Sequence, residues 1–319
     1  MTIQKMLETA IQNNNFAELE QFFETGEGKD LPYEERNELF ITSSKLKAFD
    51  YCPWAYKLRF IDKVPNPAND EDYFTIGQAV DDFLTEGSLD DYTVVSRRVD
   101  PNEGIIEQME RIKKAETDTL KDGSLSARAK KTIEAANQKI EELRKMEGLT
   151  QLTESQYDQV QKCVDEFNES PLTCKSPKKK VLFWHIGRGK VVKVELDNYI
   201  EGKEIRDIKT TANITKFNPA SYLLQMCLYQ LVVEEVTGER LPVILEVVDK
   251  WKYASRSRVV QFSDQTLVSY RNTLMRIIHE YIEAHELEWF EPTTDQEKKY
   301  NSPYYGYQGY GRPTEIEIY

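Results

Sequence analysis

The sequence predicts an α/β fold in which a mixed β-sheet is flanked by helices and carries a charged helical insertion. Three observations support this prediction. Apolar residues recur at helical spacing in several segments before residue 90, and strand-like segments follow residue 180. Between them, from about 103 to 150, charged residues dominate. Strands that alternate with helices are typical of the α/β class.

The size and charge of the chain limit the classes of function that it can have. Its 319 residues, 39% of them hydrophobic, suffice for one large domain or two small ones. The net charge of −13 excludes a uniformly basic protein that coats nucleic acid. It does not exclude a local basic groove, since salt screens exposed charges beyond about 8–10 Å. No apolar run resembles a signal peptide or a membrane span, so we expect a soluble cytoplasmic protein.

The elements before the charged stretch are helical. Residues 1–40 form an N-terminal helical segment, which the glycine-rich stretch GEGKDLP breaks. Ser43 or Ser44 is expected to cap the next helix, and Pro53 to begin another. Residues 73–87 form a further amphipathic helix with an apolar side.

The charged stretch at 103–150 contains a solvent-exposed helix over 126–148. Thr153 then caps a further helix and can form a capping box with Gln156. We interpret the charged stretch as a helical insertion, without chemistry of its own, in a domain that spans 41–290.

The second half of the chain changes in character. Strands are expected at 181–187, 191–200, 204–210, 242–250 and 257–263. Helices are expected at 220–238 and 264–286, and the first of these is stopped by Gly238. The remaining residues, 291–319, form a tail that is rich in tyrosine and glycine, and we assign it no element.

Two acidic residues stand ten positions apart on consecutive expected strands. Alternation places Asp207 and Lys209 on one face of the second strand, and Asp197 ends the first. If Gly202 supplies a left-handed residue in a three-residue turn, Asp197 lies opposite Asp207. Opposed Cβ atoms in an antiparallel pair lie about 4.5–5.5 Å apart, and like charges there are destabilising.

A cation between the two carboxylates explains this arrangement, and an ordinary charged hairpin edge is the alternative. Mg²⁺ or Mn²⁺ suits two carboxylates better than zinc does, and Lys209 could hold a hydroxide or neutralise phosphate charge. An acid-x-lysine triplet is common in so charged a chain. Among such triplets, only Asp207-Ile208-Lys209 is flanked by strand-like apolar residues. These residues alone leave both alternatives open.

Four stretches, spanning roughly Thr42 to Tyr229, carry a family resemblance. They are TSSKLKAFDYCPWAYKLRFIDK, GQAVDDFL, the hairpin with Asp207-Ile208-Lys209, and QMCLY. In this order they resemble the PD-(D/E)XK nuclease superfamily, especially its RecB-like and phage exonuclease branch. The resemblance implies a restriction-endonuclease-like core and metal-dependent hydrolysis of DNA phosphodiesters.

The resemblance also implies roles for individual residues. The expected ligands of Mg²⁺ or Mn²⁺ are Asp81, Asp197, Asp207 and the carbonyl of Ile208. The expected catalytic residues are Asp197, Asp207, Lys209, Gln225 and Tyr229, with Lys209 activating water. Asp81 stands where relatives carry histidine, and without the resemblance it is a solvated helix residue. Gln225 and Tyr229, one helical turn apart, are expected to contact Lys209 or the DNA backbone, or else are plain helix surface.

The cysteines argue against one variant of this family. Some RecB-like nucleases hold a [4Fe–4S] cluster with one early cysteine and three near the C-terminus. Cys52 matches the first, but no cysteine follows Cys227. We therefore predict no iron–sulfur cluster and interpret Cys52 as a small buried residue.

DNA is the expected partner, together with a recombination or replication protein. The candidate phosphate contacts, each of which could equally be a solvated loop residue, are Lys178, Lys179, Lys180, Arg188, Lys190, Lys252, Arg256 and Arg258. The resemblance implies an exonuclease of recombination or repair, and allows a phage origin, which would place it in the host cytoplasm. The alternative is a protein of nuclease fold that binds DNA or a partner without cutting.

Overall fold

The computed structural model describes residues 2–28, 31–64, 71–120, 124–174, 177–250 and 256–290. The chain forms two compact units. The first joins Met1–Glu71 to Asp165–Tyr319, and the second is Asp72–Val164. Within the described residues, no helix is both long and apolar enough to span a bilayer.

The first unit is built on a mixed β-sheet, as the sequence predicts. Its strands are β3 (Lys180–His185), β4 (Val191–Leu196), β5 (Asn198–Ile200), β6 (Glu204–Thr211), β7 (Val243–Asp249) and β8 (Ser257–Gln261). The order β5-β6-β7-β8 forms one sheet, in which β6 and β7 are parallel and the other pairs antiparallel. Strands β3 and β4 form a separate antiparallel pair. The predicted α/β class is therefore confirmed.

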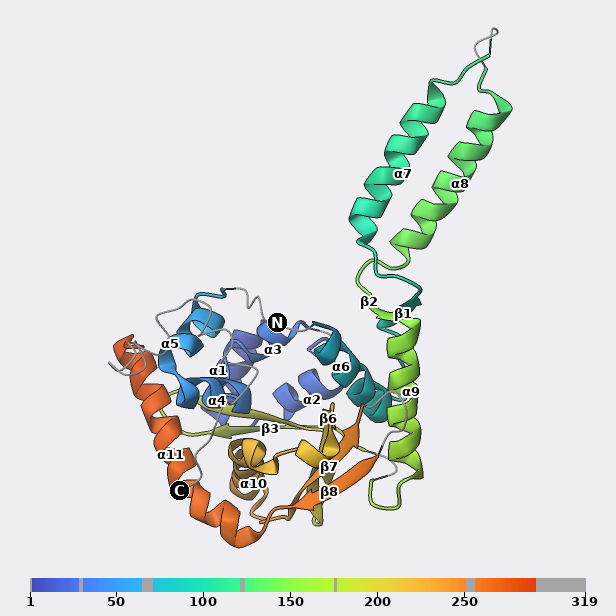
Figure 1. The fold of residues 1–319 in the computed structure, drawn as a ribbon. Helices are drawn as coiled ribbons and strands as arrows, with labels where there is room; N and C mark the ends of the chain where they lie inside the picture. The colour runs from blue at the N-terminus through green and yellow to red at the C-terminus, as the bar shows by residue number, and fades with distance from the viewer. Residues whose placement is uncertain are drawn as a thin grey trace. The chain divides into compact units, whose positions relative to one another are not determined.

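Helices surround these strands in the first unit. They are α1 (Ile3–Asn13), α2 (Ala17–Thr25), α3 (Tyr33–Asn37), α4 (Ser43–Tyr51), α5 (Pro53–Tyr56), η1 (Lys57–Ile61), η2 (Ile214–Lys216), η3 (Pro219–Tyr222), α10 (Leu223–Thr237) and α11 (Asp264–Leu287). Helix α10 contacts β3, β4 and β7 as well as α4 and α11 (Figure 1). It is buried on nearly all sides, as a helix without a polar face must be.

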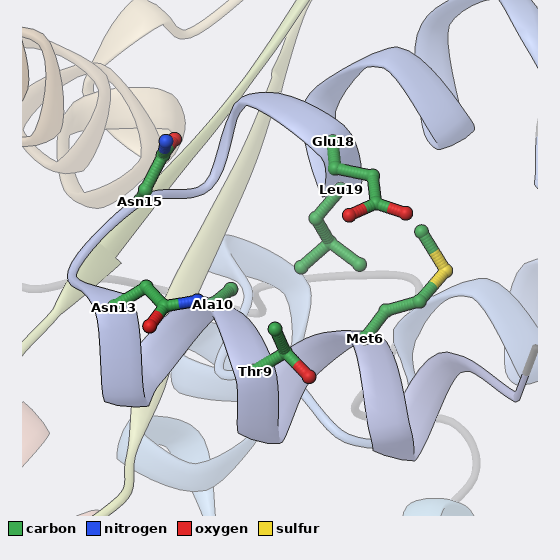
Figure 2. Close-up of a pocket in the computed structure, with 7 residues that line it drawn as sticks. All are labelled: Met6, Thr9, Ala10, Asn13, Asn15, Glu18 and Leu19. Atoms are coloured by element: carbon green, nitrogen blue, oxygen red, sulfur yellow. The ribbon is translucent and has the colours of Figure 1, made fainter.

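A second, smaller core lies under the N-terminal helices. Aromatic and aliphatic side chains of α1 and α2 pack on Val181, Phe183 and Val191 of the β3–β4 pair. The opposite face of β4, with Val192 and Val194, belongs to the main core. A shallow pocket between α1 and α2 is lined by Met6, Thr9, Ala10, Asn13, Asn15, Glu18 and Leu19 (Figure 2). None of these is a predicted site residue.

The second unit contains the charged stretch. Its elements are α6 (Glu71–Glu86), β1 (Tyr92–Val95), α7 (Pro101–Glu116), α8 (Ala127–Arg144), β2 (Thr150–Thr153) and the first part of α9 (Glu154–Glu169). Helices α7 and α8 lie side by side as a hairpin (Figure 1). The helices approach closely at Gly104, where a Cβ atom would lie 2.9 Å from Cδ1 of Leu143. This unit extends beyond 103–150 on both sides.

Two local predictions have opposite outcomes. The cap of α4 is Thr42, whose hydroxyl accepts a hydrogen bond from the amide of Lys45, so the prediction of Ser43 or Ser44 is wrong. The physical reason is that a β-bridge at Ile41 holds the chain extended up to this point. The capping box of α9 is confirmed, with the amide of Thr153 donating to Gln156 at 2.8 Å and the amide of Gln156 donating back at 3.3 Å.

Candidate active site

The two acids of the hairpin stand opposite each other, as the sequence predicts. Strands β5 and β6 pair Asn198 with Arg206 and Ile200 with Glu204, and continuing this register places Asp197 opposite Asp207. Gly202 forms the turn with a φ of +66°, a left-handed conformation that glycine adopts without strain. The predicted register is therefore confirmed.

Asp197 lies where the chain leaves one strand pair for the other. It falls between β4, which pairs with β3, and β5, which pairs with β6. Its Oδ2 atom accepts a hydrogen bond of 2.8 Å from the amide of Ile208. This bond holds the carboxylate over β6.

Asp207 lies on β6 and is completely buried, with 0% of its surface exposed. Its Oδ1 atom accepts a hydrogen bond of 3.0 Å from Nε2 of Gln225, and its Oδ2 atom lies 2.6 Å from Nζ of Lys209. Burial raises the pKa of Asp207 to about 7, and the nearby Asp197 carboxylate adds to this rise, while Lys209 opposes it. The fold therefore maintains a carboxylate that is costly to ionise.

The Lys209 ammonium lies among three oxygen atoms of the hairpin. Its Nζ atom is 2.6 Å from Oδ2 of Asp207 and 3.8 Å from Oδ2 of Asp197, and it donates to the carbonyl of Ile208 at 3.0 Å. These are the two predicted acids and the predicted carbonyl. The hairpin thus concentrates negative oxygen atoms around one cation.

This donor set suits a hard divalent ion. Two carboxylates and a carbonyl are ligands that Mg²⁺ and Mn²⁺ prefer, whereas zinc favours nitrogen and sulfur. Across the part of the chain that the structure describes, no three His, Cys, Asp or Glu side chains gather closely enough to bind a metal. The hairpin therefore supplies two carboxylates and the carbonyl of Ile208.

Gln225 and Tyr229 lie on α10, beside Asp207 of β6. Nε2 of Gln225 donates to Oδ1 of Asp207 at 3.0 Å and to the hydroxyl of Tyr229 at 2.7 Å, which uses both of its N–H groups. Tyr229 is buried, and burial raises its pKa well above the ordinary value. The pair therefore contacts the acid of the hairpin, and the burial of Tyr229 does not fit a contact with the DNA backbone.

Asp81 lies on α6 in the second unit, where its side chain is half-buried. The hydroxyl of Thr85, one turn later in the helix, donates a hydrogen bond of 2.7 Å to the backbone carbonyl of Asp81. The ligand role of Asp81 stays a prediction.

The predicted DNA-binding residues are spread over several surface segments of the first unit. Three of them form ion pairs: Lys180 with Glu20 and Glu24, Arg188 with Glu286, and Arg256 with Asp249. Lys178, Lys179 and Arg258 are exposed, and Lys190 is half-buried. Lys252 lies outside the described residues. Ion pairing makes three of these cations less available to phosphate.

Two residues beside Lys209 were not predicted from the sequence. Nζ of Lys209 lies 5.8 Å from the centroid of the Tyr222 ring, and Nζ of Lys47 lies 5.5 Å from the same centroid. Lys47 comes from α4 and Tyr222 from η3. No local sequence signal marks either residue, because only the packing of α4 on α10 brings them together.

The sequence of the chain matches a known protein family. The family model of the PDDEXK-like domain of unknown function (DUF3799) matches residues 42–296, which include the hairpin. No curated protein matches the sequence. Among solved structures, a candidate exonuclease from Eubacterium rectale is similar, with 18% identity, a TM-score of 0.47, and 83% of this chain and 87% of that chain covered. Since the family model covers most of the sequence, the chain belongs to the DUF3799 family and thereby to the PD-(D/E)XK nuclease superfamily.

Proposed function

We propose that this protein is a metal-dependent DNA nuclease whose active site is the hairpin of β5 and β6. One observation carries the proposal: two opposed carboxylates, Asp197 and Asp207, share the Lys209 ammonium, with Asp207 fully buried. A structural ion pair does not need a second acid, and burying one is costly. Two carboxylates that can bind a divalent cation, with an ammonium that can neutralise phosphate charge, suit metal-assisted hydrolysis of a phosphodiester.

Asp197, Asp207 and the carbonyl of Ile208 would hold Mg²⁺ or Mn²⁺. Such an ion, when bound, lowers the pKa of a coordinated water and neutralises charge on the phosphate. Asp207 is held in place by Gln225, and Asp197 by the amide of Ile208. The proposed ligand role of Asp81 rests on the family resemblance alone.

Lys209 would act on the water and the phosphate. Its Nζ atom has three N–H groups and lies beside both carboxylates, so it can donate a hydrogen bond to the attacking water or to a non-bridging phosphate oxygen. A bond to the water would orient it for attack, and a bond to the phosphate would stabilise the negative charge on its oxygen atoms. Gln225 would position Asp207 through its 3.0 Å hydrogen bond, and Tyr229 would hold Gln225 in place.

The proposed mode of cleavage and biological role rest on the resemblance to the RecB-like and phage exonuclease branch. We propose an exonuclease that acts on DNA ends during recombination or repair, with DNA as the substrate. The acidic net charge of −13 requires that DNA meet a local cationic surface rather than the molecule as a whole.

A cleavage assay tests this proposal. Full-length protein is incubated with end-labelled linear duplex and with circular DNA, in Mg²⁺, Mn²⁺ or excess chelator. The expected result is loss of the linear DNA only with a divalent ion, and none with Asp207→Asn. Glu204→Gln is the control, because Glu204 lies on the same strand but pairs with Arg206. Equal cleavage by Asp207→Asn would refute the site, and binding without cleavage would favour a non-catalytic DNA-binding protein.

A further inference from the structure

Two lysines approach one aromatic ring at the edge of the hairpin site. The Nζ atoms of Lys47 and Lys209 lie 5.5 Å and 5.8 Å from the Tyr222 centroid. The Tyr222 ring is stacked on Phe217, with centroids 5.4 Å apart and an angle of 19° between the rings. Both rings are half-buried, so they form a supported platform rather than a mobile surface group.

The position of Lys47 follows from the packing of α4. Its neighbours Leu46 and Ala48 are buried in the main core, and the helix contacts α10 and α11. Lys47 is exposed, on a different side of the helix from these apolar residues. The core therefore fixes the direction in which this lysine projects, and that direction is toward Tyr222.

Lys47 differs in its electrostatic surroundings from Lys180, Arg188 and Arg256, which are held in ion pairs. Lys47 is exposed as a residue, but its amino group lies over the Tyr222 ring, where partial loss of solvent and, to a lesser extent, the nearby Lys209 charge lower the pKa of Lys47. Across the described residues, it forms no ion pair with a carboxylate, whereas Lys180 and Arg256 do. Lys209 is already paired with Asp207, so Lys47 is the lysine at this ring that has no carboxylate partner among the described residues. A DNA strand would supply a phosphate for Lys47 and a base or sugar beside the ring.

We propose that Lys47 and Tyr222 form the contact for the DNA strand beside the scissile phosphodiester. Lys47 pairs with a backbone phosphate, and the Tyr222 ring, supported by Phe217, packs against a base or sugar of the same strand. This inference rests on the proposed nuclease function for the position of the scissile bond. Both residues are substrate-binding groups, because neither touches the carboxylates that would hold the metal.

DNA binding in chelator tests the contact without cleavage. A fluorescently labelled oligonucleotide duplex with a single-stranded end is titrated with full-length protein at several salt concentrations, and anisotropy is measured. Lys47→Gln is expected to weaken binding about fivefold and to reduce the slope of log K against log salt by about 0.7–0.9, the loss of one phosphate contact. Lys47→Arg should restore both. Tyr222→Leu is expected to weaken binding about fivefold, and Tyr222→Phe to leave it unchanged.

Lys57 provides a matched control. Its Nζ atom lies 5.8 Å from the centroid of the Trp54 ring, but it is paired with Asp62 at 2.6 Å. Lys57→Gln removes one positive charge from the same unit without touching the Tyr222 platform. If Lys57→Gln and Lys47→Gln change the affinity and the salt slope equally, or if the wild type binds no DNA, the inference is overturned.

Kinetics separate this inference from the proposed function. In Mg²⁺, Lys47→Gln is expected to raise KM about fivefold while kcat stays within about twofold, as for loss of uniform substrate binding. If the wild type binds DNA through Lys47 but does not cut it, the proposed function fails and the strand contact stands. If the wild type cuts, and Lys47→Gln matches it in affinity, salt slope and KM, the contact fails and the function stands.

Discussion

Nζ of Lys209 lies 2.6 Å from Oδ2 of Asp207, a carboxylate that is fully buried, and the two side chains come from the same strand, β6. Residues two apart on a strand share one face, so the ion pair is a direct result of the sequence. In this arrangement the ammonium occupies the oxygen atoms that a divalent ion would use. Lys209 should therefore contribute to cleavage without contributing to metal binding.

Replacing Lys209 tests this separation. We expect Lys209→Met to lower the rate of DNA cleavage at least 10²-fold, the usual contribution of a group that activates water. Its affinity for Mn²⁺ should be unchanged or higher, because a competing cation has been removed from Asp207. Calorimetric titration and a cleavage assay on the same preparation measure the two effects. Weaker Mn²⁺ binding in this variant would contradict the proposed arrangement.

The metal-free protein should be stabilised by removal of the Asp207 charge. Burial raises the pKa of Asp207 from 3.8 to about 7, so ionising it costs folding free energy as pH rises between these values. We expect Asp207→Asn to be more stable than the wild type at pH 8 in chelator. The difference should vanish toward pH 4, where the wild-type carboxyl is protonated in the folded state.

Denaturant unfolding at pH 4, 6 and 8 measures this dependence. Glu204→Gln on the same strand is again the control, since the Glu204 carboxylate is paired with Arg206. A wild-type protein that is more stable than Asp207→Asn at pH 8 would show that Lys209 and Gln225 outweigh the cost of burial.

The two hydrogen bonds of Gln225 should contribute differently to catalysis and to folding stability. Gln225→Leu removes the bond to Asp207 and should lower the cleavage rate, since Asp207 loses the group that orients it. Tyr229→Phe keeps the ring and leaves one N–H of Gln225 without its 2.7 Å partner, which typically costs about 1–3 kcal/mol of stability. We therefore expect Tyr229→Phe to act mainly on unfolding and Gln225→Leu mainly on cleavage. The reverse pattern would assign Tyr229 a direct part in the reaction.

A separate pH dependence should come from His285, far from the proposed chemistry in sequence. Burial, with smaller contributions from Lys190 and Lys45, lowers the pKa of His285 from 6.5 to about 4. Its Nε2 atom lies 2.8 Å from the hydroxyl of Tyr56. Because the folded state resists protonation, stability present above pH 6.5 should be lost as pH falls toward 4.

Thermal unfolding between pH 4 and 7.5 tests this prediction. His285→Gln should show a weaker fall in stability over this range than the wild type. The exposed His279, on the same helix, provides the control, and His279→Gln should follow the wild type. Identical curves for all three proteins would mean that His285 does not resist protonation in the fold.

The hairpin could be predicted from sequence because local rules determine it. Alternating residues set the faces of β6, and Gly202 sets the turn, so the opposition of Asp197 and Asp207 follows from spacing alone. The change of pairing partner at Asp197 could not be predicted, because residues 191–200 have the sequence pattern of one continuous strand. The chain divides there because β4 pairs with β3, whereas β5 pairs with β6.

Long-range packing accounts for the rest of what the sequence did not predict. Lys47 and Tyr222 meet only because α4 packs on α10, and neither residue differs in type from many others in so charged and aromatic a chain. The resemblance predicts that Gln225 contacts Lys209 or the DNA backbone. In the structure, the Nε2 atom of Gln225 donates to Asp207, an acceptor that the sequence did not indicate.

Cation binding tests the central claim most directly. Full-length wild type, Asp197→Asn, Asp207→Asn and Glu204→Gln are titrated with Mn²⁺ in a calorimeter, and their folding is verified by circular dichroism. We expect wild type and Glu204→Gln to bind Mn²⁺ alike, and each aspartate variant to bind it at least tenfold more weakly. Equal binding by all four proteins would contradict a metal site between these two strands.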